Sequence, residues 1–266
     1  MLRQKNAMQM WQHLLPLVRK AGSAILEVYE SGLTEVEFKA DASPVTQADL
    51  AANRVLVEGL AGLMEDCPVV SEEDEASAVH RSGSGRFWLL DPLDGTREFL
   101  ARNGEFTVNV ALIEDGRSVL GVVFAPVLDA LYWGGPGLGA FKSVKGVTAA
   151  IGVQANADQG VCRVLASKSH LNEETLAFIQ RLGDVVLIQA GSSLKFCRVA
   201  EGAADVYPRL SPTCEWDTAA AQAVLEGAGG RVLDMNGEPL RYGKPDVLNP
   251  SFVAFGVDAL PASGQP

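Results

Sequence analysis

The sequence has few basic residues for its length. Its 266 residues include 22 Lys and Arg against 33 Asp and Glu, which gives a formal net charge of −11. A nucleic-acid groove or a patch for an anionic membrane needs clustered Lys and Arg, so the composition argues against both kinds of partner. A small phosphorylated ligand is still compatible with this charge, because metal ions can supply the positive charge at its site.

Cysteine and histidine are also scarce. The four cysteines are scattered and form no CxxC motif. Since no signal peptide is visible, we interpret them as reduced thiols in a cytoplasmic protein. The three histidines, His13, His80 and His170, are too dispersed to predict a zinc site. No apolar run approaches the roughly 18 residues of a transmembrane helix, so stable membrane insertion is not expected. The sequence indicates no oligomeric state.

The remaining composition, 47% hydrophobic and 21% charged, is that of an ordinary globular protein. Apolar spacing predicts a helix over 8–30 and a second helix from about Gln47. Strands then follow one another, including a β-hairpin around Asp115-Gly116. After Ala150, strands alternate with helices. We therefore predict an α+β half over 1–155 and an α/β half over 156–266.

Acidic residues stand at the ends of predicted strands and near the starts of predicted helices. In "DPLDGTREFL", Asp91 and Asp94 directly follow the apolar strand "RFWLL". Glu72 follows another short strand, and Asp49 and Asp217 lie near helix starts. Such positions are where α/β proteins place their sites. Each acid also has an ordinary explanation: a helix N-cap at Asp217, a turn at Asp91, a solvated acidic loop at Glu72 and a surface helix position at Asp49.

Taken together, the acids predict a site for hard divalent cations. If the fold brings Glu72, Asp91, Asp94 and Asp217 together, their mutual repulsion requires positive charge between them. A ligand set made only of oxygen atoms suits Mg²⁺. Beside these acids, the backbone N–H groups of "GT", Gly95-Thr96, would stand at a helix start and could receive a phosphate.

Three segments resemble the signatures of the inositol monophosphatase superfamily of Mg²⁺-dependent, lithium-sensitive phosphatases. "SEED" resembles its upstream glutamate motif, "DPLDGTREF" its DPxDGTxxF motif and "WDTAAAQAVLEGAGG" its WDxAAxxxxxxxAGG motif. They occur in the family's order and span most of the chain. "SPVTQAD", "SKSH" and "GSSLKFC" are most similar to the CysQ-type 3′(2′),5′-bisphosphate nucleotidases. The resemblance implies a layered αβαβα sandwich of the sugar-phosphatase type.

The resemblance also implies a cofactor set of two to three Mg²⁺ ions. Glu72, Asp91 and the backbone carbonyl of Leu93 would hold the first ion. Asp91, Asp94 and Asp217 would hold the second, and Glu72, through water, would help to hold a weaker third. The half over 1–155 would thus carry most metal ligands, and the half over 156–266 would carry the last ligand and the nucleotide side.

In the same family pattern, Thr96 would orient and activate the attacking water while hydrogen-bonded to Asp49. Two departures from the pattern are minor. Arg97 stands where the branch often has Lys, and Glu215 places an acid before the tryptophan of the downstream motif. The second departure concerns the charge beside Asp217 and removes no ligand.

On the nucleotide side, the resemblance implies contacts from Ser192 and Lys195 to the 5′-phosphate, ribose or base, and weaker candidates in Lys168, His170 and Arg209. Alternatively, Ser192 could be a helix N-cap, and Lys168 and Arg209 could be solvated surface cations. The residues expected to contact the substrate near the metals are Glu72, Leu93, Asp94, Gly95, Thr96 and Asp217.

We therefore predict a phosphomonoesterase that converts adenosine 3′,5′-bisphosphate to AMP and phosphate in support of sulfur metabolism. It would be cytoplasmic, and the family adds an expectation of peripheral association with the cytoplasmic side of the inner membrane. One alternative is an inositol monophosphatase or sugar bisphosphatase with the same metal chemistry. Another is a non-catalytic Mg²⁺ or nucleotide sensor, although a sensor would not need the water activators Thr96 and Asp49.

Overall fold

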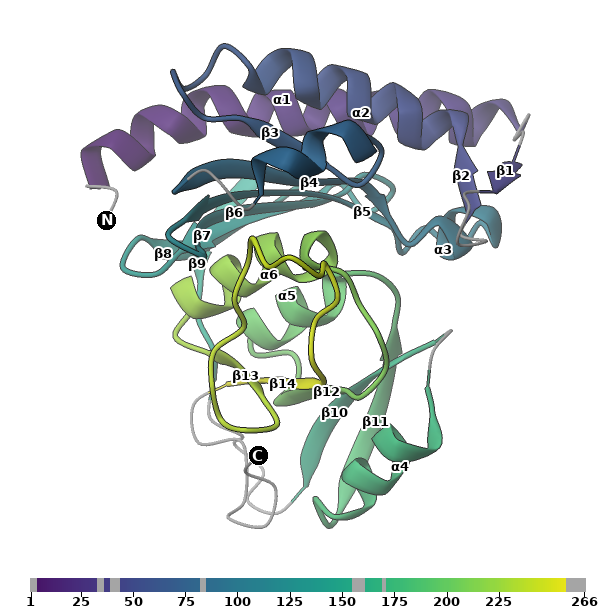
Figure 1. The fold of residues 1–266 in the computed structure, drawn as a ribbon. Coiled ribbons are helices and arrows are strands. Elements are labelled where there is room, and N and C mark those ends of the chain that lie inside the picture. The colour runs from purple at the N-terminus through teal and green to yellow at the C-terminus, as the bar shows by residue number, and fades with distance from the viewer. Residues whose placement is uncertain are drawn as a thin grey trace.

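The computed structural model describes residues 4–32, 36–38, 44–81, 85–154, 161–168 and 171–256. Layers of helix, sheet, helix, sheet and helix follow one another from top to bottom in Figure 1. The two β layers are a seven-stranded sheet and a five-stranded sheet, and a separate pair of short strands, β1 and β2, lies beside them. The predicted layered αβαβα sandwich is confirmed.

The helices are α1 (Gln4–Ser31), α2 (Gln47–Leu60), α3 (Thr96–Leu100), α4 (Glu173–Gln180), α5 (Leu194–Ala200), α6 (Glu215–Gly227) and a short 3₁₀ helix, η1 (Glu75–His80). The strands are β1 (Val36–Phe38), β2 (Pro44–Thr46), β3 (Val69–Ser71), β4 (Arg86–Asp94), β5 (Thr107–Glu114), β6 (Arg117–Ala125), β7 (Ala130–Gly135), β8 (Gly139–Val144), β9 (Val147–Ile151), β10 (Cys162–Ser167), β11 (Val185–Ala190), β12 (Val206–Arg209), β13 (Arg231–Asp234) and β14 (Phe252–Phe255).

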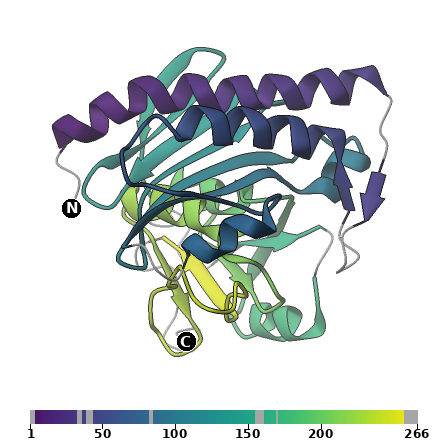
Figure 2. The same ribbon diagram turned by 45° about the horizontal axis from the view of Figure 1, so that its top comes forward.

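The seven-stranded sheet is buried on both faces, and its strands alternate between two cores. On β4, Trp88 and Leu90 pack with α1 and α2, whereas Phe87 and Leu89 pack with α5 and α6. Because successive side chains of a strand point to opposite faces, a run that is apolar at every position is what a doubly covered sheet requires. Figure 2 shows α1 and α2 lying side by side over this sheet.

The five-stranded sheet has the order β11-β10-β12-β14-β13. One face packs on α5 and α6 through the same core as the large sheet, and the other face packs on α4 through Val164, Phe178 and Val206. The middle helices are therefore shared between the sheets. This sharing explains why α6, which lies late in the chain, packs against β5, β6 and β7.

The predicted helices over 8–30 and from Gln47 and the hairpin around Asp115-Gly116 are confirmed. Strands β2, β9 and β14 were not predicted. The chain passes from one sheet to the other between Ile151 and Cys162, and the division at 155/156 stays a prediction. Within the described ranges, none of the helices combines the length and the apolar character that crossing a bilayer would need.

Candidate active site

A β-bulge places Asp91 and Asp94 on the same face of the sheet. The sequence predicted that the strand ends at "DPLDG", but β4 continues through Asp94. Asp91 lies opposite Asn109 of β5 and Asp94 lies opposite Thr107. Between these two pairs the chain advances three residues on β4 but only two on β5, so β4 contains one extra residue. In a regular strand, residues three apart point to opposite faces, and the extra residue of a bulge corrects this. Both acids therefore face the α5 and α6 layer.

Strand β3 brings Glu72 beside this pair. It runs parallel to β4 with Ser71 opposite Leu90, and the backbone N–H of Glu72 donates to the carbonyl of Leu90 at 3.2 Å. Glu72 thus follows the end of β3, next to the last residues of β4, which include Asp91. Parallel neighbours carry their carboxyl ends to the same edge of a sheet, which explains this meeting.

Asp217 reaches the site from the first turn of α6. Its Oδ2 accepts the backbone N–H of Cys214 at 2.7 Å, so Asp217 is the third residue of the helix and caps it from within. The ordinary explanation as a cap is therefore correct in part, although the N-cap residue is Cys214. Asn249 fixes the same turn, since its Nδ2 donates to the carbonyl of Cys214 at 2.7 Å.

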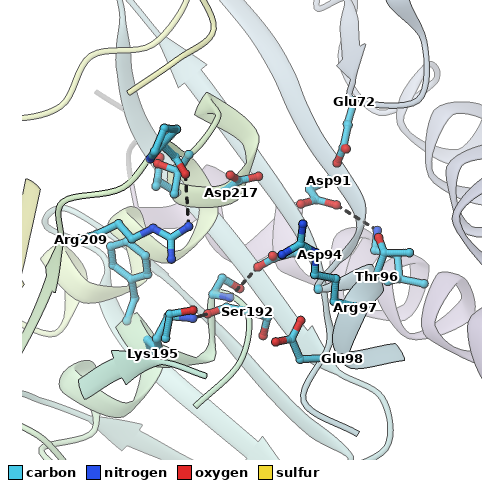
Figure 3. A pocket seen from close by; sticks show the side chains of 18 of the residues that line it. Glu72, Asp91, Asp94, Thr96, Arg97, Glu98, Ser192, Lys195, Arg209 and Asp217 are labelled. Carbon is cyan, nitrogen blue, oxygen red and sulfur yellow. Dashed lines mark hydrogen bonds between the residues drawn. The ribbon is translucent and has the colours of Figure 1, made fainter. Parts of the chain in front are cut away.

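These elements surround a cavity of about 270 Å³ (Figure 3). It is lined by all the residues predicted to hold metal, Glu72, Asp91, Leu93, Asp94 and Asp217, and by Gly95, Thr96, Ser192, Lys195 and Arg209 from the predicted substrate contacts. We call Glu72, Asp91, Asp94 and Asp217 the carboxylate wall, and Ser192, Lys195 and Arg209 the cationic wall. In Figure 3, Lys195 and Arg209 stand across the cavity from Glu72 and Asp91, and Asp94 and Asp217 lie between them.

The carboxylate wall carries more negative charge than its surroundings neutralise. Burial raises the pKa of Asp91 well above its usual range, and repulsion from Glu72 and Asp94 adds to this. The pKa of Asp217 is raised well above its usual range in the same way, by burial and then by Asp94 and Glu72. Burial also raises the pKa of Asp94, although Lys195 opposes the shift. Such a wall favours a bound cation.

The donor set fits a hard divalent ion such as Mg²⁺. It consists of carboxylates and a backbone carbonyl, with no sulfur or imidazole, which is the chemistry that Mg²⁺ prefers. Within the described ranges, no three Asp, Glu, His or Cys side chains converge closely enough to enclose an ion as they stand. The fit therefore rests on donor chemistry and on the electrostatic need for positive charge.

Thr96 and Asp49 meet beside the carboxylate wall. The Thr96 hydroxyl donates to Asp49 Oδ1 at 3.5 Å, a long hydrogen bond. Asp49 Oδ2 accepts the backbone N–H of Thr46 at 2.8 Å and its hydroxyl at 2.6 Å, as the capping box of α2. Asp49 is only 1% exposed, so the alternative of a surface helix position is wrong. Burial raises its pKa to about 6.

Gly95 allows the sharp exit from β4 into α3. Its φ of +93° lies in the left-handed region, which strains any residue with a Cβ. A Cβ there would also lie 3.2 Å from Glu98 Oε2 and 3.4 Å from the Cβ of Ser192. The glycine of "DPLDGT" is therefore explained by both conformation and space.

The cationic wall is buried. Lys195 Nζ donates to the carbonyl of Ser192 at 2.6 Å and stands 5.2 Å from the centre of the Tyr207 ring. Burial lowers its pKa to about 8, while Asp94 opposes the shift. Arg209 is 8% exposed, and its buried Nε has no hydrogen-bond partner among the residues that the structure describes. The alternative of a solvated surface cation is therefore wrong for Arg209.

Ser192 is not the N-cap of α5, because Ser193 holds that position and the helix begins at Leu194. Ser192 has a φ of +47°, which is rare for a residue with a side chain. Lys168 pairs with Glu105 at 2.8 Å and is not among the residues that line the cavity. His170 lies outside the described residues.

Several residues of the site were not predicted. Ser193, Thr107 and Asn109 all hydrogen-bond to Asp94, and Tyr207 and Phe252 line the cavity beside Lys195. The segment "EFTVNVALI" contains Thr107 and Asn109, but its alternating pattern is that of an ordinary strand. Their roles become visible only when β5 and the start of α5 come together.

The two departures from the family pattern have structural explanations. Arg97 is exposed and lines the cavity, as a lysine there could. Glu215 is fully buried, and its carboxylate accepts the backbone N–H groups of Gly243 and Lys244 and pairs with Lys244 Nζ at 2.5 Å. Its charge is therefore neutralised locally and anchors the loop that follows β13.

Comparison with known proteins shows the family of this chain. The sequence model of the inositol monophosphatase family matches residues 7–258. The chain belongs to the inositol monophosphatase family. Within that family it is similar to the 3′(2′),5′-bisphosphate nucleotidase CysQ of Salmonella typhimurium (strain LT2), with 48% identity over 246 residues that cover 91% of this chain and 98% of that protein.

Solved structures of family members have the same fold. The crystal structure of CysQ from Bacteroides thetaiotaomicron superposes with a TM-score of 0.82 at 41% identity, covering 95% of this chain and 97% of that one. The extragenic suppressor protein SuhB from Bartonella henselae superposes with a TM-score of 0.76 at 25% identity, covering 94% of each chain.

Proposed function

We propose that this member of the inositol monophosphatase family is a Mg²⁺-dependent phosphomonoesterase that hydrolyses adenosine 3′,5′-bisphosphate to AMP and phosphate. The observation that carries the proposal is one cavity that holds both the carboxylate wall and two buried cations, Lys195 and Arg209. A substrate with two phosphates can use both walls. The similarity to proteins named 3′(2′),5′-bisphosphate nucleotidase supports this choice of substrate.

The residues that would hold Mg²⁺ are Glu72, Asp91, the carbonyl of Leu93, Asp94 and Asp217, and two to three ions are expected. When bound, Mg²⁺ offsets the carboxylate charge, polarises the phosphate and lowers the pKa of a water molecule. The Leu93 backbone is already ordered for such a role, because its N–H donates to Asp91 Oδ1 at 3.0 Å.

Thr96 and Asp49 would aim the attacking water. The Thr96 hydroxyl donates its proton to Asp49, so its oxygen lone pairs stay available to accept a hydrogen bond from water. With a pKa of about 6, Asp49 is mostly ionised at neutral pH and can act as the acceptor. Thr46 holds the other carboxylate oxygen, which keeps Asp49 aimed at Thr96.

Lys195 and Arg209 would bind the second phosphate. Both are buried at the cavity, and a charge-assisted hydrogen bond contributes about 1.5–3 kcal/mol. The Arg209 Nε proton is also not used by any acceptor within the described ranges. Tyr207 and Phe252, whose ring centres lie 5.9 Å apart, add an apolar surface next to these cations. The base of a nucleotide suits this combination better than an inositol ring does.

A phosphate-release panel tests the proposal. Adenosine 3′,5′-bisphosphate, inositol 1-phosphate, a sugar bisphosphate and AMP are each incubated with the protein and Mg²⁺, with an EDTA blank. We expect release only with metal and a kcat/KM for the bisphosphate nucleotide about 10²–10³ above that for inositol 1-phosphate. Equal efficiencies would favour an inositol phosphatase, and no release from any substrate would favour a sensor.

A further inference from the structure

We propose that Thr107, Asn109 and Ser193 are positioning residues that restrict Asp94 to binding metal through one oxygen and that couple metal binding to nucleotide binding. The inference rests on the proposed function and deepens it. We call these three residues the Asp94 cradle. They come from both halves of the chain, since Thr107 and Asn109 lie on β5 and Ser193 directly precedes α5.

The cradle surrounds one oxygen of Asp94. Asp94 Oδ2 accepts the backbone N–H of Ser193 at 2.5 Å, the Thr107 hydroxyl at 3.3 Å and the Asn109 Nδ2 at 3.3 Å. All three cradle residues are at most 2% exposed. A carboxylate oxygen offers about two lone-pair directions. Three donors leave no direction open on Oδ2, so Oδ1 is the oxygen available to a metal ion.

The cradle residues also hold one another. The Ser193 hydroxyl donates to Asn109 Oδ1 at 2.7 Å, and the Thr107 hydroxyl lies 2.8 Å from the Ser193 oxygen. Because the Ser193 hydroxyl donates to Asn109 Oδ1, the Thr107 hydroxyl is left to donate to both the Ser193 oxygen and Asp94 Oδ2. This assignment also orients the Asn109 amide, because its NH₂ must face the carboxylate. The network is closed and buried, and such networks keep their members in one arrangement.

The Ser193 N–H, one of the three donors to Asp94 Oδ2, links Asp94 to the cationic wall. Ser193 follows Ser192, which has a φ of +47°, and lies two residues before Lys195. β5 is a central strand of the large sheet, whereas the turn at Ser192 is held in a strained conformation. A phosphate that binds Lys195 and stabilises this turn also stabilises the hydrogen bond from the Ser193 N–H to Asp94. Binding of nucleotide should then tighten metal, and by linkage metal should tighten nucleotide to the same extent.

Calorimetric titration of Mg²⁺ into the full chain, with and without AMP, tests the inference without turnover. Thr107→Val removes the hydroxyl and keeps the shape, whereas Thr107→Ser keeps the hydroxyl. We expect Thr107→Val and Asn109→Ala to weaken Mg²⁺ binding about 10–100-fold, and Thr107→Ser to restore it to within a few-fold of wild type. Thr148→Val, at an exposed threonine of β9 in the same sheet, is the matched control.

Ser193→Ala tests the coupling. It removes the hydroxyl that holds Ser193 to Thr107 and Asn109 of β5, so the Ser193 N–H is kept on Asp94 less firmly. The gain in Mg²⁺ affinity that AMP produces in wild type should therefore fall by at least half. If Thr107→Val does not fold, Ser193→Ala and Asn109→Ala carry the test. Metal affinity and AMP coupling unchanged in folded variants would overturn the inference. Its failure is distinct from failure of the proposed function, in which wild type itself releases no phosphate from any substrate.

Discussion

The two walls of the cavity are built in different ways. Three of the four acids of the carboxylate wall lie at the carboxyl ends of neighbouring strands: Glu72 follows β3, and Asp91 and Asp94 belong to the last part of β4. The segment from Glu72 to Asp94 has 23 residues. The cationic wall comes from the start of α5 and from β12, and its geometry depends on a strained turn at Ser192. Apart from Asp217, which α6 supplies, the first wall is a feature of one sheet edge, and the second arises where two layers meet.

In the proposed function, the carboxylate wall serves the reaction itself, whereas the cationic wall selects the substrate. The acids can hold metal next to any phosphate monoester, so they contribute equally to every substrate of that class. Lys195 and Arg209 act on a part of the substrate that does not react, and they can therefore change which substrate is preferred. Variants in one wall should alter turnover generally, and variants in the other should alter the ratio between substrates.

Asp94→Asn should have the largest effect. It removes a charge from the carboxylate wall, so phosphate release at saturating Mg²⁺ should fall by several decades while the fold is kept. Without metal, its melting temperature should rise, because repulsion with Asp91 and Asp217 is relieved. Steady-state kinetics and thermal unfolding in EDTA check both parts. Near-normal turnover would contradict the assignment of the carboxylate wall.

Thr96→Ala should come next. The hydroxyl orients water and holds no metal, so kcat should fall about 10²–10³-fold while KM and Mg²⁺ affinity stay close to wild type. The measurement is kcat and KM together with an Mg²⁺ titration. Thr96→Ser, which keeps a hydroxyl, is the matched control. A loss of metal affinity with kcat preserved would show that the role is different.

Lys195→Ala should have a smaller but more selective effect. Loss of its charge-assisted hydrogen bond should lower kcat/KM for adenosine 3′,5′-bisphosphate about 10–100-fold and change that for inositol 1-phosphate much less. The comparison of both substrates in both proteins is the test. Lys20→Ala, at an exposed position of α1, is the control. Equal losses on both substrates would mean that the cationic wall does not select.

The last effect leaves turnover aside and concerns the stability of the metal-free protein as a function of pH. Asp49 has a folded pKa of about 6 against an ordinary value of 3.8, so between these values the folded state binds more protons than the unfolded state. Stability should therefore fall as pH rises through this window. Relative to a pH below 3.8, the free energy of unfolding is lowered by about 3 kcal/mol above pH 6, at about 1.4 kcal/mol for each pKa unit.

Asp49→Asn should remove this part of the pH dependence while its amide oxygen still caps α2. In EDTA, urea unfolding of the variant and of wild type should agree at pH 4 and diverge toward pH 7, with the variant more stable. Curves that stay parallel across the window would contradict the raised pKa of Asp49.

Much of the fold could be predicted from local patterns. The helices over 8–30 and from Gln47, the hairpin at Asp115-Gly116 and the alternating second half follow from apolar periodicity and turn residues, which act over a few positions. The missed strands β2, β9 and β14 have no such signal, and β2 has only three residues. β9 is exposed along its first four residues, and β14 is only four residues long.

The sequence by itself determined the chemistry of the site. The types of the donors, their order along the chain and the glycine at 95 are covalent facts, and together they indicate an oxygen-only cation site beside a tight turn. They also place Thr96 next to those donors, since it is two residues from Asp94.

Only the tertiary structure decided how these groups are aimed. The bulge in β4 turns Asp91 and Asp94 to one face, Lys168 is drawn into a pair with Glu105, and Arg209 is buried at the cavity. Asp94 and the N–H of Ser193 are 99 residues apart in the chain yet 2.5 Å apart in space. Contacts of that kind depend on how sheets and helices stack, and stacking is fixed by packing over the whole core, which no local pattern encodes.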